Sequence, residues 1–238
     1  MVIAAILAGG VGKRMGDIDK PKQFLEIGGK PILVHTTEQF VRHNRIDHVV
    51  VLCPEEWIEY TRQVFRSCPG LIDIPVISGG PERNDTIMNA IGYIEREFGL
   101  DQDTVIVTHD AVRPFVTGDI LERGWQMARA CGNAVCGVPA KDTVKIADAE
   151  GVVQQTPPRD RVWIVQTPQI FSGPLIRSAY EALGDCAPAG ITDDAMVLEY
   201  SRKAPVHMFQ GAYTNIKITT PDDLVTGEAI LKKMGSSL

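Results

Sequence analysis

The sequence has few of the residues and patterns that mark several large protein classes. Its five cysteines are an odd number and include no Cys-x-x-Cys pair. We therefore expect scattered reduced thiols rather than a disulfide framework or a zinc site. No apolar run approaches the roughly 20 residues that a transmembrane helix needs. The apolar N-terminus lacks a basic start and a cleavage site, so we expect a buried strand there and a cytoplasmic protein.

An excess of positive charge is also absent. The chain has 24 Lys and Arg against 30 Asp and Glu, a formal net charge of -6. Nucleic-acid binders normally carry a basic face, so we expect no nucleic-acid partner, and no membrane partner either. With 44% hydrophobic residues in 238, the chain is long enough to bury a substantial core. We expect one domain over residues 1–238, with residues 140–165 as a projecting arm.

Strand-like and helix-like patterns alternate along the chain. Strands are expected at residues 2–7, 48–53, 75–78, 104–108, 134–138, 206–209 and 215–218. Helices are expected at residues 31–42, 55–67, 85–98, 118–131, 174–183, 193–201 and 221–234. This alternation predicts an α/β fold, a Rossmann-like and mainly parallel twisted sheet flanked by helices. Such sheets bind ligands at the carboxyl ends of their strands.

Residues 140–165 interrupt this alternation. We expect residues 142–146 and 162–165 to pair as strands around a polar loop, forming a β-arm that leaves the main sheet. The apolar residues of the arm, Trp163 among them, would either meet a second subunit or pack against their own domain. The sequence leaves these two alternatives open.

A glycine-rich turn follows the first expected strand, in Leu7-Ala-Gly-Gly-Val-Gly-Lys-Arg-Met15. Glycines let backbone N–H groups approach an anion closely, and Arg14 adds positive charge. The pattern is neither the G-x-x-x-x-G-K-[ST] loop nor G-x-G-x-x-G. It predicts a triphosphate site of another kind.

Two further segments carry charge at places that suit a ligand. In Asp19-Lys-Pro-Lys-Gln-Phe24, Lys22 is placed to stabilise charge on a transferring phosphorus, although a solvated basic loop is the alternative. In Thr108-His-Asp-Ala-Val-Arg-Pro114, Asp110 either serves a ligand or pairs with Arg113. His109 is favoured as a structural histidine.

Seven ordered blocks give the chain a specific resemblance: LAGG-x-G-x-RM, PKQF, GG-x-x-R, HDAVRPF, QTPQ-x-F, TDDA and NIK-TTP-DL. They run from Ala8 to Leu224 and resemble the CTP-dependent cytidylyltransferases that act on methylerythritol phosphate or ribitol phosphate. The resemblance implies CTP and a polyol phosphate as substrates, a divalent cation that is usually Mg²⁺, and a homodimer that exchanges arms.

The resemblance also implies roles for particular residues. Catalysis would depend on the cations Arg14, Lys22 and Lys217, with Asp110 near the metal. CTP would be bound by Leu7, Ala8, Gly9, Gly10, Gly12, Gly79, Gly80, Arg83, Thr86 and Asp110. The acceptor would be bound by Asp110, Arg113, Thr143, Arg159, Thr167, Thr192 and Lys217. Pro81 stands where some relatives carry an acidic residue, and it offers no N–H to the base.

The acceptor is the finer question. Features of the first half, such as Leu7-Ala-Gly-Gly10 and Glu56-Trp57, resemble the ribitol phosphate enzymes, whereas Lys141–Lys145 and Val162-Trp163 resemble the methylerythritol phosphate enzymes. We expect D-ribitol 5-phosphate, with 2-C-methyl-D-erythritol 4-phosphate as the alternative. Asp193 and Asp194 either form a metal pair or supply favourable charge at a helix start.

Two rival functions are disfavoured. Sugar-phosphate nucleotidylyltransferases that use UTP, GTP or ATP share the first two blocks but lack HDAVRPF and QTPQ-x-F. A non-catalytic nucleotide-binding regulatory protein would not need to keep the charged set of Arg14, Lys22, Asp110 and Lys217.

Overall fold

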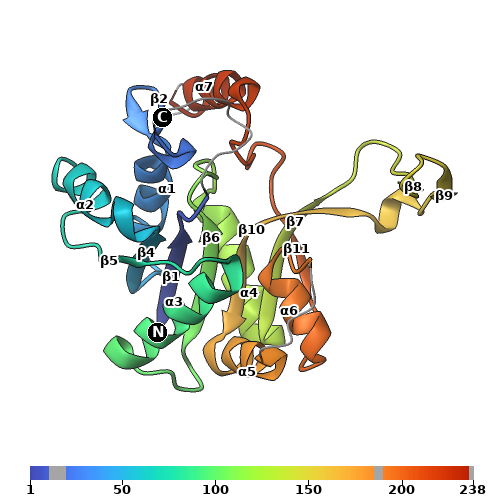
Figure 1. Cartoon of the computed structure of the whole chain (residues 1–238), viewed down its shortest axis with the longest axis horizontal. Coiled ribbons are helices and arrows are strands. Elements are labelled where there is room, and N and C mark those ends of the chain that lie inside the picture. Colours follow the sequence, from blue (N-terminus) through green and yellow to red (C-terminus); the bar gives the residue numbers. More distant parts are fainter. Residues whose placement is uncertain (11–19, 185–189, 236–238) are drawn as a thin grey trace.

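The computed structural model describes residues 1–10, 20–184 and 190–235, so Gly12 and Arg14 lie outside the described residues. A seven-stranded sheet forms the centre, in the order β11-β7-β10-β6-β1-β4-β5 (Figure 1). Its strands are β1 (Val2–Leu7), β4 (His48–Cys53), β5 (Val76–Ser78), β6 (Val105–Asp110), β7 (Asn133–Pro139), β10 (Trp163–Ser172) and β11 (Met208–Gln210). All adjacent pairs are parallel except the two that β10 forms. The mainly parallel α/β sheet is confirmed.

Helices cover both faces of the sheet. One face packs against α1 (Ile32–Val41), α2 (Ile58–Arg66) and α4 (Gly118–Cys131). The other face packs against α3 (Arg83–Phe98), α5 (Gly173–Leu183) and α6 (Asp194–Ser201). The last helix, α7 (Pro221–Gly235), packs on the small hairpin of β2 (Glu26–Ile27) and β3 (Lys30–Pro31). None of the helices in the described residues is long and apolar enough to cross a membrane.

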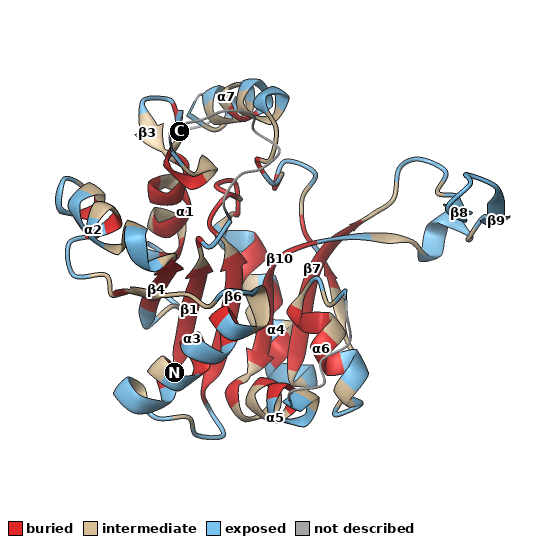
Figure 2. Cartoon of the chain, viewed as in Figure 1, coloured by how far each residue is buried: buried red, intermediate tan, exposed pale blue. Residues whose placement is uncertain are grey.

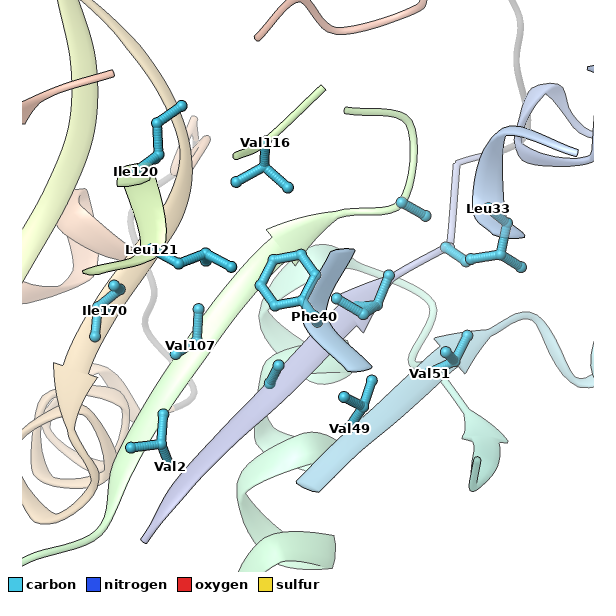
Figure 3. Packing of buried hydrophobic residues seen from close by; sticks show 14 of the residues in the cluster. Val2, Leu33, Phe40, Val49, Val51, Val107, Val116, Ile120, Leu121 and Ile170 are labelled. Carbon is cyan, nitrogen blue, oxygen red and sulfur yellow. The ribbon is translucent and has the colours of Figure 1, made fainter. Parts of the chain in front are cut away.

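The core follows from the two-residue period of the strands. In β1, Ala4 and Ile6 face the layer of α1 and α4, whereas Ile3 faces the layer of α3 and α5. Phe40 of α1 is fully buried over the centre of the sheet, near Val49 and other apolar side chains (Figure 3). Because parallel strands are buried on both faces, they read as continuous apolar runs, which is why β1, β4 and β6 were predictable from sequence.

The long strand β10 was not predicted beyond Val165. It runs antiparallel between β6 and β7, where Gln169 pairs with Thr108 and Ile170 with Val107. Its register on β7 breaks between Val165 and Gln169, and the peptide bond between Thr167 and Pro168 is cis. Polar residues and a proline in Gln166–Gln169 hide the strand pattern, because they serve contacts at the end of the sheet rather than the core.

The arm projects from the sheet and is largely exposed (Figures 1 and 2). The predicted pairing of residues 142–146 with 162–165 is wrong. Residues 163–165 pair with residues 137–139 of β7, and the tip of the arm is formed by β8 (Ile146–Ala147) and β9 (Val153–Gln155). Pro157 and Pro158 lie between β9 and β10, and since proline has no N–H they end the strand pairing there.

One further predicted strand is absent. Residues 215–218 join no sheet, although the N–H of Ile218 donates to the carbonyl of Val112 at 2.9 Å. Ile218 is fully buried under α7, whereas Lys217 points the other way, so the expected alternation of side chains holds without a strand.

We expect Phe171→Ala to lower the free energy of unfolding by about 3–5 kcal/mol, because it leaves a cavity in the layer between β10 and α5. Urea denaturation measures this change. Val225→Ala on α7, where the side chain is 72% exposed, is the control and should stay within about 0.5 kcal/mol. Equal effects of the two variants would contradict this account of the core.

Candidate active site

A cleft of about 430 Å³ opens at the carboxyl ends of β1 and β6. These two strands are adjacent and parallel. The strands that follow β1 in sequence, β4 and β5, lie on one side of it in the sheet, whereas β6 and the later strands lie on the other side. The cleft therefore lies where the strand order reverses. It is lined by eleven of the predicted site residues: Leu7, Gly9, Gly10, Gly80, Arg83, Thr86, Asp110, Arg113, Thr167, Thr192 and Lys217.

The nucleotide wall, defined as residues 7–10 and 79–86, forms one side of the cleft. Gly80 sits so close to α3 that a Cβ there would lie 2.0 Å from the Cβ of Asp85, and its N–H donates to Thr86 Oγ1 at 3.0 Å. Only glycine fits such a close approach. Pro81 also lines the cleft. Two predicted residues of this wall do not line the cleft: Ala8 is buried, and the N–H of Gly79 donates to the carbonyl of Cys53.

Lys22 lies beside the glycine turn. Its Cε is 3.2 Å from the position that a Cβ of Gly10 would occupy. The next residue, Gln23, is buried and donates from Nε2 to the carbonyl of Ala8 at 2.7 Å. Phe24 packs against Trp57, with ring centroids 5.2 Å apart. These two anchors explain how a short basic segment keeps Lys22 next to the predicted phosphate site.

The acceptor wall, defined as residues 110–113, 165–169, 192–193 and 217, carries an ion cluster. Asp110 Oδ2 lies 2.9 Å from Lys217 Nζ and 3.4 Å from Arg113 Nε. Burial alone would raise the pKa of Asp110, but these two cations hold the pKa well below its usual range. The N–H of Asp110 donates to Thr167 Oγ1 at 3.1 Å. The sequence left open whether Asp110 serves a ligand or pairs with Arg113. In the structure it pairs with Arg113 and also lines the cleft.

His109 is structural. It is fully buried, its Nε2 lies 3.0 Å from the carbonyl oxygen of Arg113, and its ring contacts Phe40 at 4.8 Å between centroids. Burial lowers the pKa of His109 to about 4, so the ring is neutral at physiological pH.

The pair Asp193 and Asp194 does not form a metal site. Asp193 caps α6 by accepting the N–H of Met196 at 2.9 Å, as the helix-start alternative predicts. The fully buried carboxylate of Asp194 forms a two-pronged ion pair with the guanidinium of Arg83. Arg83 was predicted to bind CTP, and it lines the cleft, but the prediction missed this partner. Groups of three or more metal-ligating side chains are absent from the described part of the chain.

Two glutamines of β10 belong to the site but were not singled out. Gln166 donates to the carbonyl of Ala212 at 2.9 Å. Gln169 accepts the N–H groups of Asp194 and Ala195, each at 3.1 Å, and donates to Asp193 Oδ2 at 2.8 Å. Both line the cleft. The QTPQ-x-F block contains them, but the sequence alone gave no reason to separate them from a polar loop.

Thr143 and Arg159 lie on the exposed arm and not at the cleft of their own chain. Arg159 Nη1 donates to the carbonyl of Lys141 at 3.1 Å, near the base of the arm. Arg14 and Gly12 lie outside the described residues, so their predicted roles remain predictions.

A glycine turn with a lysine beside it, across a cleft from two cations and one carboxylate at a strand-order reversal, suits the chemistry of a nucleotidyltransferase. Residues 2–233 match the family described as 2-C-methyl-D-erythritol 4-phosphate cytidylyltransferase (IspD). The chain belongs to this family, and it is a CTP-dependent cytidylyltransferase.

Solved structures agree over almost the whole chain. The 4-diphosphocytidyl-2C-methyl-D-erythritol synthase of Anaerococcus prevotii is 29% identical, with 97% of this chain and 96% of that chain covered and a TM-score of 0.80. The Francisella tularensis enzyme is 27% identical, with 96% and 99% covered and a TM-score of 0.79. The Thermus thermophilus enzyme is 26% identical, with 98% and 100% covered and a TM-score of 0.74. Both are named 2-C-methyl-D-erythritol 4-phosphate cytidylyltransferases.

The ion cluster predicts how stability depends on pH. Because the folded pKa of Asp110 is depressed, the stability from its charge is complete above the ordinary aspartate pKa of about 3.9 and is lost as pH falls through the folded value. We expect the difference in free energy of unfolding between the wild type and Asp110→Asn to stay constant between about pH 5 and 8 and to narrow below about pH 4. Urea denaturation across this range measures it, and two parallel curves down to pH 3 would contradict the pairing.

Proposed function

We propose that the protein transfers a cytidylyl group from CTP to 2-C-methyl-D-erythritol 4-phosphate, releasing pyrophosphate. The product is then 4-diphosphocytidyl-2-C-methyl-D-erythritol, an isoprenoid precursor. The observation that carries the proposal is the Asp110–Lys217–Arg113 cluster, which faces the glycine turn across one cleft. The expected ribitol 5-phosphate acceptor is not confirmed, and the family and the related structures, all named for the methylerythritol compound, favour the alternative.

The chemistry needs no protein nucleophile. A phosphate oxygen of the acceptor attacks the α-phosphorus of CTP, and the bond to the oxygen that bridges the α- and β-phosphates breaks as pyrophosphate leaves with the electron pair. The backbone N–H groups of the glycine turn bind the nucleotide phosphates. Lys22, beside the nucleotide wall, and Lys217, on the acceptor wall, stabilise the charge that develops around the phosphorus. Positioning and electrostatics supply most of the rate enhancement.

The acceptor wall suits a phosphorylated polyol. Lys217 and Arg113 offer cations to the acceptor phosphate, and Arg113 is held in place by the carbonyl of Asn215 at 2.9 Å. The ionised carboxylate of Asp110 accepts hydrogen bonds from hydroxyl groups. Thr167 and Thr192 add hydroxyl groups to the same wall.

We propose Mg²⁺ as the companion of CTP. The described cleft offers Asp110 as its ligand from the acceptor wall, and Mg²⁺ commonly takes one or two carboxylates together with substrate phosphates and water. The residues present fit this arrangement. When bound, the ion neutralises charge on the nucleotide phosphates.

We also propose that the arm works in a homodimer, where Thr143 and Arg159 reach the cleft of the partner subunit. The arm carries several half-exposed apolar side chains far from its own core, among them Ile146 at 49%, Val153 at 52% and Ile164 at 51% exposure. Apolar surface of this kind on a projecting hairpin is stabilised when a second subunit covers it.

Pyrophosphate release with CTP and Mg²⁺ tests the acceptor. We expect kcat/KM for 2-C-methyl-D-erythritol 4-phosphate to exceed that for D-ribitol 5-phosphate by about a hundredfold or more, since a polar pocket discriminates strongly between hydroxyl patterns. CTP should raise the melting temperature, whereas UTP should not. The opposite acceptor preference would show that the first-half resemblance was the better guide.

Mixing two inactive variants tests the exchange of arms. Lys22→Ala removes a residue of a subunit's own cleft, and Arg159→Ala removes a residue of the arm. Heterodimers then contain one intact site, and an equal mixture that re-associates at random should recover about one quarter of wild-type activity. Activity that stays at the level of the separate variants would mean that Arg159 does not act across subunits.

A further inference from the structure

Asp194 is a fully buried carboxylate to which the proposed chemistry gives no role. Its oxygens take donors from three separate elements: Arg83 of α3, Thr108 of β6 and Tyr180 of α5. Arg83 Nη2 lies 2.9 Å from Oδ2, and Tyr180 Oη lies 2.6 Å from Oδ1. Burial alone would raise the pKa of Asp194, but Arg83 lowers it, so the carboxylate is ionised.

The three partners of the carboxylate lie in different places. Arg83 is the first residue of α3, directly after the turn of residues 79–82, and it lines the cleft. Tyr180 is buried in the layer between α5 and the sheet and does not line the cleft. One carboxylate therefore has a donor on the cleft side and a donor on the core side.

Asp194 directly follows a segment of the opposite wall. It is the first residue of α6, next to Thr192 and Asp193, which line the acceptor wall. Gln169 fixes the same helix start by accepting the N–H of Asp194 at 3.1 Å. The pair of Arg83 and Asp194, 111 residues apart in sequence, thus joins the nucleotide wall directly to the acceptor wall.

We propose that Asp194 is a positioning residue that holds the nucleotide wall and the acceptor wall at a fixed separation, so that its loss weakens binding of both substrates. A bidentate ion pair between a guanidinium and a carboxylate fixes the relative orientation of the two groups as well as the distance between them. A small misplacement of groups that bind a reacting phosphate costs much of the rate enhancement. The inference rests on the cleft being the CTP site, as in the proposed function, but not on which polyol phosphate is the acceptor.

The experiment compares variants on the two sides of the same carboxylate. Asp194→Asn removes the charge that holds Arg83, and Tyr180→Phe, the matched control, removes the donor on the core side. Calorimetry measures the CTP Kd with Mg²⁺ and no acceptor. Steady-state kinetics at saturating CTP then measures the KM of whichever acceptor the wild type turns over. The melting temperature reports stability separately.

We expect Asp194→Asn to raise both the CTP Kd and the acceptor KM by about tenfold. Tyr180→Phe should lower the melting temperature while leaving both constants within about twofold of the wild type. If Asp194→Asn does not fold, Arg83→Lys decides, because it keeps the charge but loses the two-pronged geometry, and it should raise the acceptor KM.

The acceptor KM is the decisive result. If Arg83 only touched the nucleotide, Arg83→Lys would raise the CTP Kd and leave the acceptor KM unchanged, which would overturn the inference. Equal effects of Asp194→Asn and Tyr180→Phe on the two constants would overturn it as well, because the network would then be merely structural. Failure of the wild type to bind CTP would instead overturn the proposed function.

Discussion

The antiparallel insertion of β10 between β6 and β7 is the constraint on which most of this structure depends. Without it, β7 and β11 would have no link to β6, and the layer of α5 and α6 would lose Phe171. Its inner end supplies Phe171 to the core, its middle supplies Gln169 to the cleft, and its outer end leaves the body as one side of the arm. Core, site and arm are therefore consecutive parts of one strand.

Two ion clusters with different degrees of burial lie at the cleft and behind it. Asp194 is sealed from solvent and holds its partner Arg83 in one geometry, whereas Asp110 is 17% exposed and pairs with Lys217, which is 40% exposed. A buried pair is costly to break because it leaves an uncompensated charge, and it therefore suits a fixed framework. A partly exposed pair exchanges partners more cheaply, and it therefore suits groups that meet a ligand.

The parts of the fold that the sequence predicted well are those governed by local pattern. The helix at Gly118–Cys131 and the strands at Val2–Leu7 and His48–Cys53 have the predicted bounds. A strand buried on both faces is a continuous apolar run, and a helix buried along one stripe has apolar residues at helical spacing, so both are visible in the sequence. Strand β10 was not predicted beyond Val165. Its residues Gln166 and Gln169 are polar because they form hydrogen bonds with residues distant in sequence, and no local pattern reveals those partners. A segment between β7 and β10 projects from the sheet, but its strand pairing differs from the predicted one, because pairing between strands depends on tertiary contacts that no local pattern shows.

The candidate site was predictable to a similar limit. Ordered motifs brought residues from six blocks to one cleft, and eleven predicted residues line it. The partners inside the network were not predictable, since the pairing of Arg83 with Asp194 spans 111 residues and involves a carboxylate that reads locally as a helix start. Such a choice between capping and ion pairing is made by packing in three dimensions.

The contact between Lys217 and Asp110 means that the free protein carries its own counter-ion. The ammonium group has already lost part of its hydration to the carboxylate, so an arriving phosphate exchanges one anionic oxygen for another and does not have to strip a fully hydrated cation. A neutral hydroxyl group competes poorly for a lysine that already has a carboxylate. On the proposed function, this exchange favours a phosphorylated polyol over the free polyol.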